Sequence, residues 1–469
     1  MLSRPSFRFS SLPGRSRRWR RRALLGLGRS GQKLSLAWAW LQGLGIPWLD
    51  RAVVLAFAVL TGLAVVGFTA LSEAATRAHR GLFHSHPWAP MALLLWAPLI
   101  AVGLLAWTRR FVPGALGSGV PQVMRAVDAE LSPEQRRWLV SPRIALHKIG
   151  LVSGGLLAGL SIGREGPTVQ VGAGVMLGAR RWLSPQTQID EHDLMVAGAA
   201  AGIAAAFNTP LGGIVYGLEQ LTRRRGIGHS SLVIAAIVLA GLIAVAFYGN
   251  NSYFGRLRVQ ELHLGLLLPG LLVALSSGLL GGLFARLMVA SAQGLPDRFS
   301  RWRRAQPLHF AAGCAFAVAL IAWVTGAQTA GAGYAPTRAL LEGQAELSGP
   351  YTLLKFCATW LSAWSGLPAG TFAPALAIGA GIGHDVAALT GLSHEAAIPL
   401  IALGMVGFLA AITQTPITAF IIVMEMVSGH SMVLSLMACS MVAAGVSRLV
   451  SPPMFEGLAA LLPLPAAKA

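Results

Sequence analysis

An arginine and a glutamate stand side by side in the middle of an apolar stretch, "SIGREGPTVQVGAG" at 161–174. The glycines around them let the backbone approach a ligand closely, and proline is tolerated in the first turn of a helix. The stretch therefore predicts a helix N-terminus, whose free N–H groups and partial positive charge attract anions. A carboxylate at this place, Glu165, would compete with the anion: ionised it blocks the site, and protonated it moves away.

The same device occurs twice more, in "GALGSGVPQ" at 114–122 and "GTFAP" at 370–374. Glycine-rich segments also serve to pack membrane helices closely, and that alternative explains any one motif equally well. Three motifs that all place a proline in the first helical turn favour an anion site formed by three helix N-termini. The motif residues are Gly117, Ser118, Gly119, Val120 and Pro121; Gly163, Arg164, Glu165, Gly166 and Pro167; and Gly370, Thr371, Phe372, Ala373 and Pro374.

The composition of the 469-residue chain places these motifs in a membrane. Hydrophobic residues make up 54%, charged residues only 12%, and the mean hydropathy is +0.62. Such a chain is an integral, multi-pass, all-α membrane protein, with apolar runs at 51–71, 89–107, 230–248, 264–292, 308–324 and 396–412. An ionisable group at membrane depth costs about 2.5–3.5 kcal/mol, so Glu165 is expected to have a function.

The formal net charge of +19 comes from short basic clusters beside the apolar runs, such as "SRRWRRR" at 16–22 and "RWRR" at 301–304. Clusters of this kind hold loops on the cytoplasmic side of a membrane, and this explains them better than nucleic-acid binding does. We expect residues 1–45 to form a basic cytoplasmic arm. The expected location is the inner (cell) membrane of a bacterium, with the N-terminus in the cytoplasm.

Two blocks of sequence recur at nearly the same offset. "GLSIGREGPTVQVGAG" at 159–174 resembles "GLPAGTFAPALAIGAG" 207 residues later, and "GAAAGIAAAFNTPLGGIVYGLEQ" at 198–220 resembles "GMVGFLAAITQTPITAFIIVMEM" 206 residues later. Two blocks in register predict duplicated halves, which we place at 46–250 and 251–465. The halves must run oppositely through the membrane, because only then do helix N-termini from both meet at one midplane site.

The three motifs resemble the selectivity-filter signatures of the CLC chloride channels and chloride/proton antiporters. "GSGVP", "GREGP" and "GTFAP" occur in the family's order, "AAAFNTPL" at 204–211 matches a further family stretch, and the resemblance covers about residues 50–465. It implies a fold of two inverted repeats with broken, re-entrant helices that meet at a midplane anion site. It also implies a homodimer with an anion pathway in each subunit, and we expect no cytoplasmic nucleotide-binding (CBS) domain.

The resemblance implies roles for individual residues. Ser118 donates its hydroxyl, and Thr371 and Phe372 their backbone N–H groups, to a central anion, while Glu165 is the external gate and proton acceptor. Serine in the first motif resembles the chloride-selecting members, whereas nitrate-selecting relatives carry proline there. Phe455 occupies the place of a tyrosine that caps the inner side of the site, so the hydroxyl is missing.

The inner proton path departs from the antiporter pattern. Gln220 stands where the antiporters have a proton-carrying glutamate, Glu219 is its neighbour, and Met124 replaces an acid of one branch. Gln220 cannot release a proton, and one step along a helix turns Glu219 by about 100°. We therefore expect chloride transport with weak or no proton coupling, gated by Glu165. The alternative is a coupled chloride/proton antiporter that uses Glu165 with Glu219 or water.

An intramembrane enzyme that uses Glu165 with Arg164 or a histidine as its acid–base pair is a remote alternative, because the second repeat has Thr371 and Phe372 in place of Arg164 and Glu165. We expect no cofactor and no metal, since histidines such as His192 lie at segment ends and suit interfacial anchoring. The sequence leaves open the roles of two lysines that lie inside apolar segments. Lys148 either raises the local positive potential or extends to an interface, and Lys355 either tunes the pathway or pairs with a backbone carbonyl.

Overall fold

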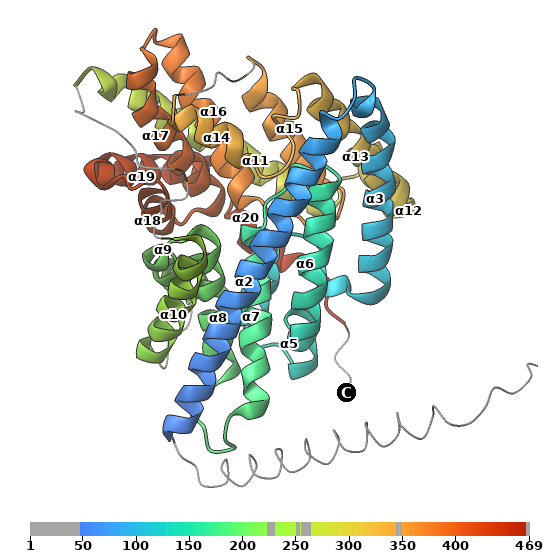
Figure 1. Ribbon diagram of the computed structural model, residues 1–469, viewed down its shortest axis with the longest axis vertical. Coiled ribbons are helices and arrows are strands. Elements are labelled where there is room, and N and C mark those ends of the chain that lie inside the picture. Colours follow the sequence, from blue (N-terminus) through green and yellow to red (C-terminus); the bar gives the residue numbers. More distant parts are fainter. Residues whose placement is uncertain are drawn as a thin grey trace, which may run out of the picture.

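The computed structural model describes residues 47–128, 130–222, 230–249, 254, 264–343, 347 and 349–465, and the expected cytoplasmic arm at 1–45 lies outside this part. Apart from one isolated β-bridge, the secondary structure of the described residues is helical (Figure 1). The helices are α2 (Pro47–Phe83), α3 (Ala89–Phe111), α4 (Val120–Ala126), α5 (Pro133–Leu139), α6 (Pro142–Leu157), α7 (Glu165–Leu177), α8 (Glu191–Phe207), α9 (Pro210–Tyr216), α10 (Ser230–Tyr248), α11 (Leu267–Gln293), α12 (Arg298–Ala305), α13 (Pro307–Val324), α14 (Tyr334–Leu341), α15 (Tyr351–Trp364), α16 (Phe372–Leu389), α17 (His394–Thr413), α18 (Pro416–Met426), α19 (Val433–Val450) and α20 (Met454–Ala460).

Eight helices of the described residues are long and apolar enough to cross a membrane. They include helices that cover all six apolar runs predicted from the sequence, so the prediction of a multi-pass α-helical membrane protein is confirmed. The extent of burial distinguishes helices inside the protein from those at its surface. Of an apolar 18-residue stretch, 89% is buried in α17 and 28% in α3. Helix α17 therefore belongs to the protein core, while α3 presents most of its apolar surface outward.

The repeated sequence blocks form two equivalent helix pairs, α7 with α8 and α16 with α17. Figure 1 shows the first pair in the lower half of the view and the second in the upper half. Glycines bring the backbones of each pair into contact, because a Cβ added to Gly198 would lie 2.3 Å from the Gly172 carbonyl oxygen, and one on Gly404 would lie 2.0 Å from that of Gly379. The contacts recur at the offsets of 207 and 206 residues found in the sequence.

The inner helix of each pair ends in the same way. The last turn of α8 is followed by Asn208 at φ 57°, and that of α17 by Gln414 at φ 54°, both in the left-handed region that stops a helix. Pro210 and Pro416 then open the short helices α9 and α18, where proline at the first position loses no hydrogen bond.

Two glutamates connect the repeats by capping each other's short helices. The Glu219 carboxylate accepts hydrogen bonds from the N–H groups of Ile417 and Thr418 at the start of α18, at 3.2 and 2.6 Å. The Glu425 carboxylate accepts in turn from Leu211 and Gly212 at the start of α9, at 3.3 and 2.8 Å. A helix start has N–H groups without partners inside the helix, so each repeat satisfies the other's.

The two halves are joined at their centre by one reciprocal backbone contact. The N–H of Gly163 donates to the Gly370 carbonyl at 2.8 Å, and the N–H of Gly370 donates back at 3.2 Å, as an antiparallel bridge. Equivalent residues that exchange the same bond are what a two-fold relation between the halves produces. The fold is thus built of inverted repeats whose broken helices begin at this bridge.

We predict that Gly404→Leu prevents stable folding, because the new side chain meets the Gly379 carbonyl oxygen in the middle of the core. Overpacking of this kind costs on the order of 3 kcal/mol or more. Gly103→Ala on α3 is the matched control, since a Cβ there meets nothing within 4 Å. Size-exclusion profiles and melting temperatures in detergent measure the effect, and a Gly404→Leu protein as stable as the control would contradict this packing.

Candidate functional site

The three predicted motifs meet at the central bridge. Gly163 and Gly370 join the second and third motifs, and the Ala369 N–H donates to the Gly117 carbonyl of the first at 3.2 Å. Between the first and second, Gly119 packs so closely that a Cβ would lie 2.9 Å from the Gly166 carbonyl oxygen. Helices α4, α7 and α16 all begin here, so three N-termini converge on one place.

Two hydroxyl groups at this convergence are buried and have no hydrogen-bond partner, Ser118 Oγ and Thr371 Oγ1. A buried polar group normally has a partner, so unpartnered donors mark a place where a ligand or water binds. They border a cavity of about 300 Å³, whose lining includes Phe455. The Phe455 ring stacks on that of Phe372 with centroids 5.4 Å apart, and so covers one side of the site with apolar surface.

Glu165 lies at the first position of α7 and is fully buried. Its carboxylate faces the backbone N–H groups at the starts of α7 and α16, including that of Ala373. One oxygen, Oε2, lies over Gly163, where a Cβ would come within 2.5 Å of it. The ionised side chain therefore stands where an anion would meet the same N–H groups, which fits the expected tethered competitor.

On its other side Glu165 is held by two groups. The Tyr334 hydroxyl donates to Oε1, and the Arg164 Nε lies 3.7 Å from the same oxygen. Arg164 also donates to Glu73 Oε1 at 3.2 Å, and its guanidinium carbon lies 5.5 Å from the centroid of the Tyr334 ring.

A second cavity, of about 480 Å³, begins at these groups. Its lining includes Glu73, Arg80, Arg164, Tyr334 and Arg338. Glu165 is in contact with Arg164 and Tyr334 of this cavity, while its neighbour Gly166 packs near Ser118 of the other. Residues that adjoin Glu165 therefore line two different cavities.

Sequence analysis missed a fourth loop, "GAGYAP" at 331–336, which is the counterpart of "GSGVP". Gly331 and Gly333 have φ values of 65° and 87°, as Gly117 and Gly119 have 72° and 104°. Tyr334 begins α14 as Val120 begins α4. The sequence held a sign of this second loop, because Lys148 and Lys355 are 207 residues apart, the offset of the repeat. The structure shows that each lysine binds one of the two loops.

Each of these buried lysines holds one loop. The Lys148 ammonium donates to the carbonyls of Ala115 and Gly117 at 2.8 and 2.6 Å. The Lys355 ammonium donates to those of Thr329 and Gly331 at 2.9 and 2.7 Å. Lys148 thus lies inside the protein and not at an interface, and Lys355 pairs with backbone carbonyls, which decides both questions that the sequence left open.

The comparisons with known proteins agree with this geometry. The family described as "Voltage gated chloride channel" matches residues 97–448. The H(+)/Cl(-) exchange transporter ClcA of Cronobacter sakazakii is 31% identical over 395 residues, 80% of this chain and 81% of the relative. The ClcA of Citrobacter koseri is 29% identical over 358 residues, 74% of this chain and 73% of the relative.

The chain belongs to the CLC family. It is a multi-pass membrane protein for anion transport, as the family match and the relatives establish. A solved structure described as a slow cyanobacterial Cl-/H+ antiporter superposes with a TM-score of 0.74 at 22% identity, covering 88% of this chain and 97% of that one. A CLC-type fluoride/proton antiporter gives 0.71 at 22% identity, covering 87% and 97%. These likenesses confirm the CLC fold.

Glu219 and Gln220, at the place where the sequence departs from the antiporter pattern, lie on one π-helical turn, Gly217–Leu221. Gln220 is buried, its Nε2 lies 3.3 Å from Met124 Sδ, and its Oε1 has no partner. Glu219 turns the other way, toward the start of α18. Adjacency in the sequence therefore does not make Glu219 a substitute for Gln220.

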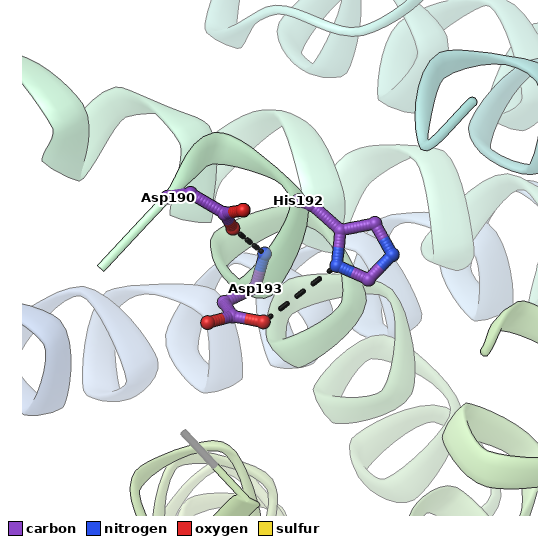
Figure 2. A group of neighbouring side chains, drawn as sticks. All are labelled: Asp190, His192 and Asp193. Atoms are coloured by element: carbon purple, nitrogen blue, oxygen red, sulfur yellow. Dashed lines mark hydrogen bonds and ion pairs between the residues drawn. The ribbon is translucent and has the colours of Figure 1, made fainter. Parts of the chain in front are cut away.

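At the start of α8, the structure brings together three side chains whose spacing in the sequence did not predict a metal site. Asp190, His192 and Asp193 place one ligand atom each within 4.8 Å of one another (Figure 2). The Asp190 carboxylate caps the helix by accepting the Asp193 N–H at 2.7 Å, and His192 Nδ1 lies 3.6 Å from Asp193 Oδ1. Carboxylates suit the positive end of a helix, whereas a cation does not, so helix capping explains the cluster.

We predict that Lys148→Met weakens anion binding, measured with chloride as the probe, about ten-fold, equal to roughly 1.4 kcal/mol. The substitution removes a positive charge beside the convergence of the motifs and the donor that holds the Ala115 and Gly117 carbonyls. Lys355→Met, the matched change on the other loop, should retain more of the chloride affinity. Calorimetric titration with chloride measures both, and unchanged affinity in Lys148→Met would contradict this role.

Proposed function

We propose that the protein exchanges chloride for protons, with an anion site formed by Ser118, Thr371, Phe372 and Phe455 and with Glu165 as gate and proton acceptor. The observation that carries the proposal is the position of the Glu165 carboxylate at the helix N-termini, next to residues that line two different cavities. Protonation removes its charge and its attraction to those N–H groups, so one group couples proton uptake to opening of the anion path.

Chloride is the proposed anion because relatives at 31% and 29% identity are named H(+)/Cl(-) exchange transporters. Ser118 supports it, since its buried, unpartnered hydroxyl is a compact neutral donor. The names of the relatives also favour coupled exchange over the weakly coupled transport that Gln220 predicts.

Water is the proposed carrier of the proton on the inner side. The Glu219 carboxylate is engaged by Ile417 and Thr418, so it is not directed toward the anion site. Gln220 Oε1 and the hydroxyl of Tyr216 are buried and unpartnered, and the Tyr216 ring lies 6.3 Å from that of Phe372. Buried polar atoms of this kind hold ordered water, which can pass a proton from the inner side toward Glu165.

Uncoupled chloride conduction is the second candidate, and the amide of Gln220 favours it.

We also infer a homodimer in a bacterial inner membrane, in keeping with the bacterial relatives. The apolar side chains of Leu211, Ile417 and Leu434 are exposed on α9, α18 and α19, and they supply surface for a second copy.

Simultaneous recording of chloride and proton movement in proteoliposomes tests the proposal. Under a chloride gradient, we expect protons to move opposite to chloride, against their own gradient. Glu165→Gln should abolish proton movement and make chloride flux independent of pH, because the amide mimics the protonated gate. Glu342→Gln, which alters an exposed partner of Arg338, is the control and should behave as wild type. Chloride flux without proton movement in the unmodified protein would establish the uncoupled candidate instead.

The role of the inner glutamine can be tested separately. We expect Gln220→Glu to raise the proton flux, since it adds a group that binds and releases protons. Glu219→Gln should lower stability by about 1–2 kcal/mol through loss of a helix cap, with the proton-to-chloride ratio unchanged. Glu425→Gln removes the equivalent cap and is its matched control. Loss of proton movement in Glu219→Gln, but not in Glu425→Gln, would make Glu219 the carrier.

A further inference from the structure

Tyr334 touches the gate from the loop "GAGYAP", the counterpart of "GSGVP". Its hydroxyl donates to Glu165 Oε1, whereas "GSGVP" has Val120 at the corresponding helix start. Ala332 in turn stands where "GSGVP" has Ser118, so the two loops carry their hydroxyl groups at different places. The Ser118 hydroxyl has no partner and is available to a ligand, and the Tyr334 hydroxyl binds the carboxylate.

The ring of Tyr334 has two neighbours that restrict the direction of its hydroxyl. The Arg164 guanidinium carbon lies 5.5 Å from the ring centroid, and the centroid of the Phe254 ring lies 6.0 Å from it. Gly333, at φ 87°, sets the start of α14, where a Cβ would come within 2.5 Å of Ala377 Cβ. Lys355 holds the loop before it through the Gly331 carbonyl. These contacts position the hydroxyl at Glu165 Oε1.

A hydrogen bond from a neutral hydroxyl to an ionised carboxylate is about twice as strong as one to a neutral acceptor. The Tyr334 contact consequently favours the ionised, closed form of Glu165 over the protonated form that leaves the site. We propose that Tyr334 is a latch of the gate: its hydroxyl holds the ionised Glu165 carboxylate in the anion path and so sets the pH at which acid opens the path. The inference rests on the proposed role of Glu165 as the gate.

Other charged and titratable groups surround the pair, and all of them remain in the Tyr334→Phe variant. They are Glu73, Arg77, His79 and Arg80 of α2, Lys148 of α6, Arg164 before α7, Tyr248 of α10, Arg338 of α14 and Lys355 of α15. Tyr334→Phe removes only the hydroxyl and keeps the ring contacts with Arg164 and Phe254. A shift in pH dependence in this variant can therefore be assigned to the lost hydrogen bond.

The test is chloride flux through proteoliposomes as a function of pH. In Tyr334→Phe, the ionised gate loses its donor and protonates more readily, so the midpoint of acid activation should move up by about one pH unit, a ten-fold change in the equilibrium. Tyr248→Phe is the matched control, because its hydroxyl donates to the Val66 carbonyl and not to the gate. Its midpoint should stay at the wild-type value.

A merely structural role is separated by repeating the measurement with Glu165→Gln. The latch acts only through the gate carboxylate, so Tyr334→Phe should change neither flux nor pH dependence in that background. If Tyr334→Phe does not elute as a folded protein, p-aminophenylalanine at 334 keeps a para donor and should keep the wild-type midpoint. An unchanged midpoint in Tyr334→Phe, or the same shift in the Glu165→Gln background, would overturn the latch. Absence of chloride flux in every variant would instead reject the proposed function.

Discussion

Where a helix is broken at membrane depth, its free backbone N–H and carbonyl groups need hydrogen-bond partners inside the protein. The rest of the structure depends on this constraint. An unpaired N–H or carbonyl in hydrocarbon costs several kcal/mol, so a broken helix is stable only where another element completes it. The reciprocal bonds of Gly163 and Gly370 complete two broken helices with each other. The Lys148 and Lys355 ammonium groups do the same for two loops, and the Glu219 and Glu425 carboxylates for two short helices.

Because the sequence is duplicated, each of these contacts occurs once in each repeat. The residues of the candidate site, in contrast, are those at which the two repeats differ. Glu165 corresponds to Phe372, and Ser118 to Ala332, so only one half contributes the carboxylate and only one the serine hydroxyl. The scaffold is symmetric because both halves must solve the same problem of unpaired backbone groups. The asymmetry of the site is what the proposed exchange needs, because a path that opens to one side at a time requires different groups at its two cavities.

The inner proton position shows how neighbouring residues acquire unrelated roles. Glu219 and Gln220 are consecutive, yet the first caps α18 of the other repeat and the second lies against Met124 beside the site. A buried carboxylate is directed by the donors it can reach, and for Glu219 these are the N–H groups of Ile417 and Thr418. Sequence position alone made Glu219 a candidate proton carrier, and its hydrogen bonds explain it as a cap.

The sequence by itself determined the membrane class, the spanning helices, the duplicated halves and the three motif loops, because hydropathy and Gly-Pro punctuation are local properties. It also predicted that Ser118, Glu165 and Thr371 belong together. Only the tertiary structure decided which carbonyls the two lysines hold, where Glu219 points, and that Tyr334 reaches Glu165 from 169 residues away. These contacts join segments far apart in the chain, and their geometry depends on how the two halves pack, which no local pattern records.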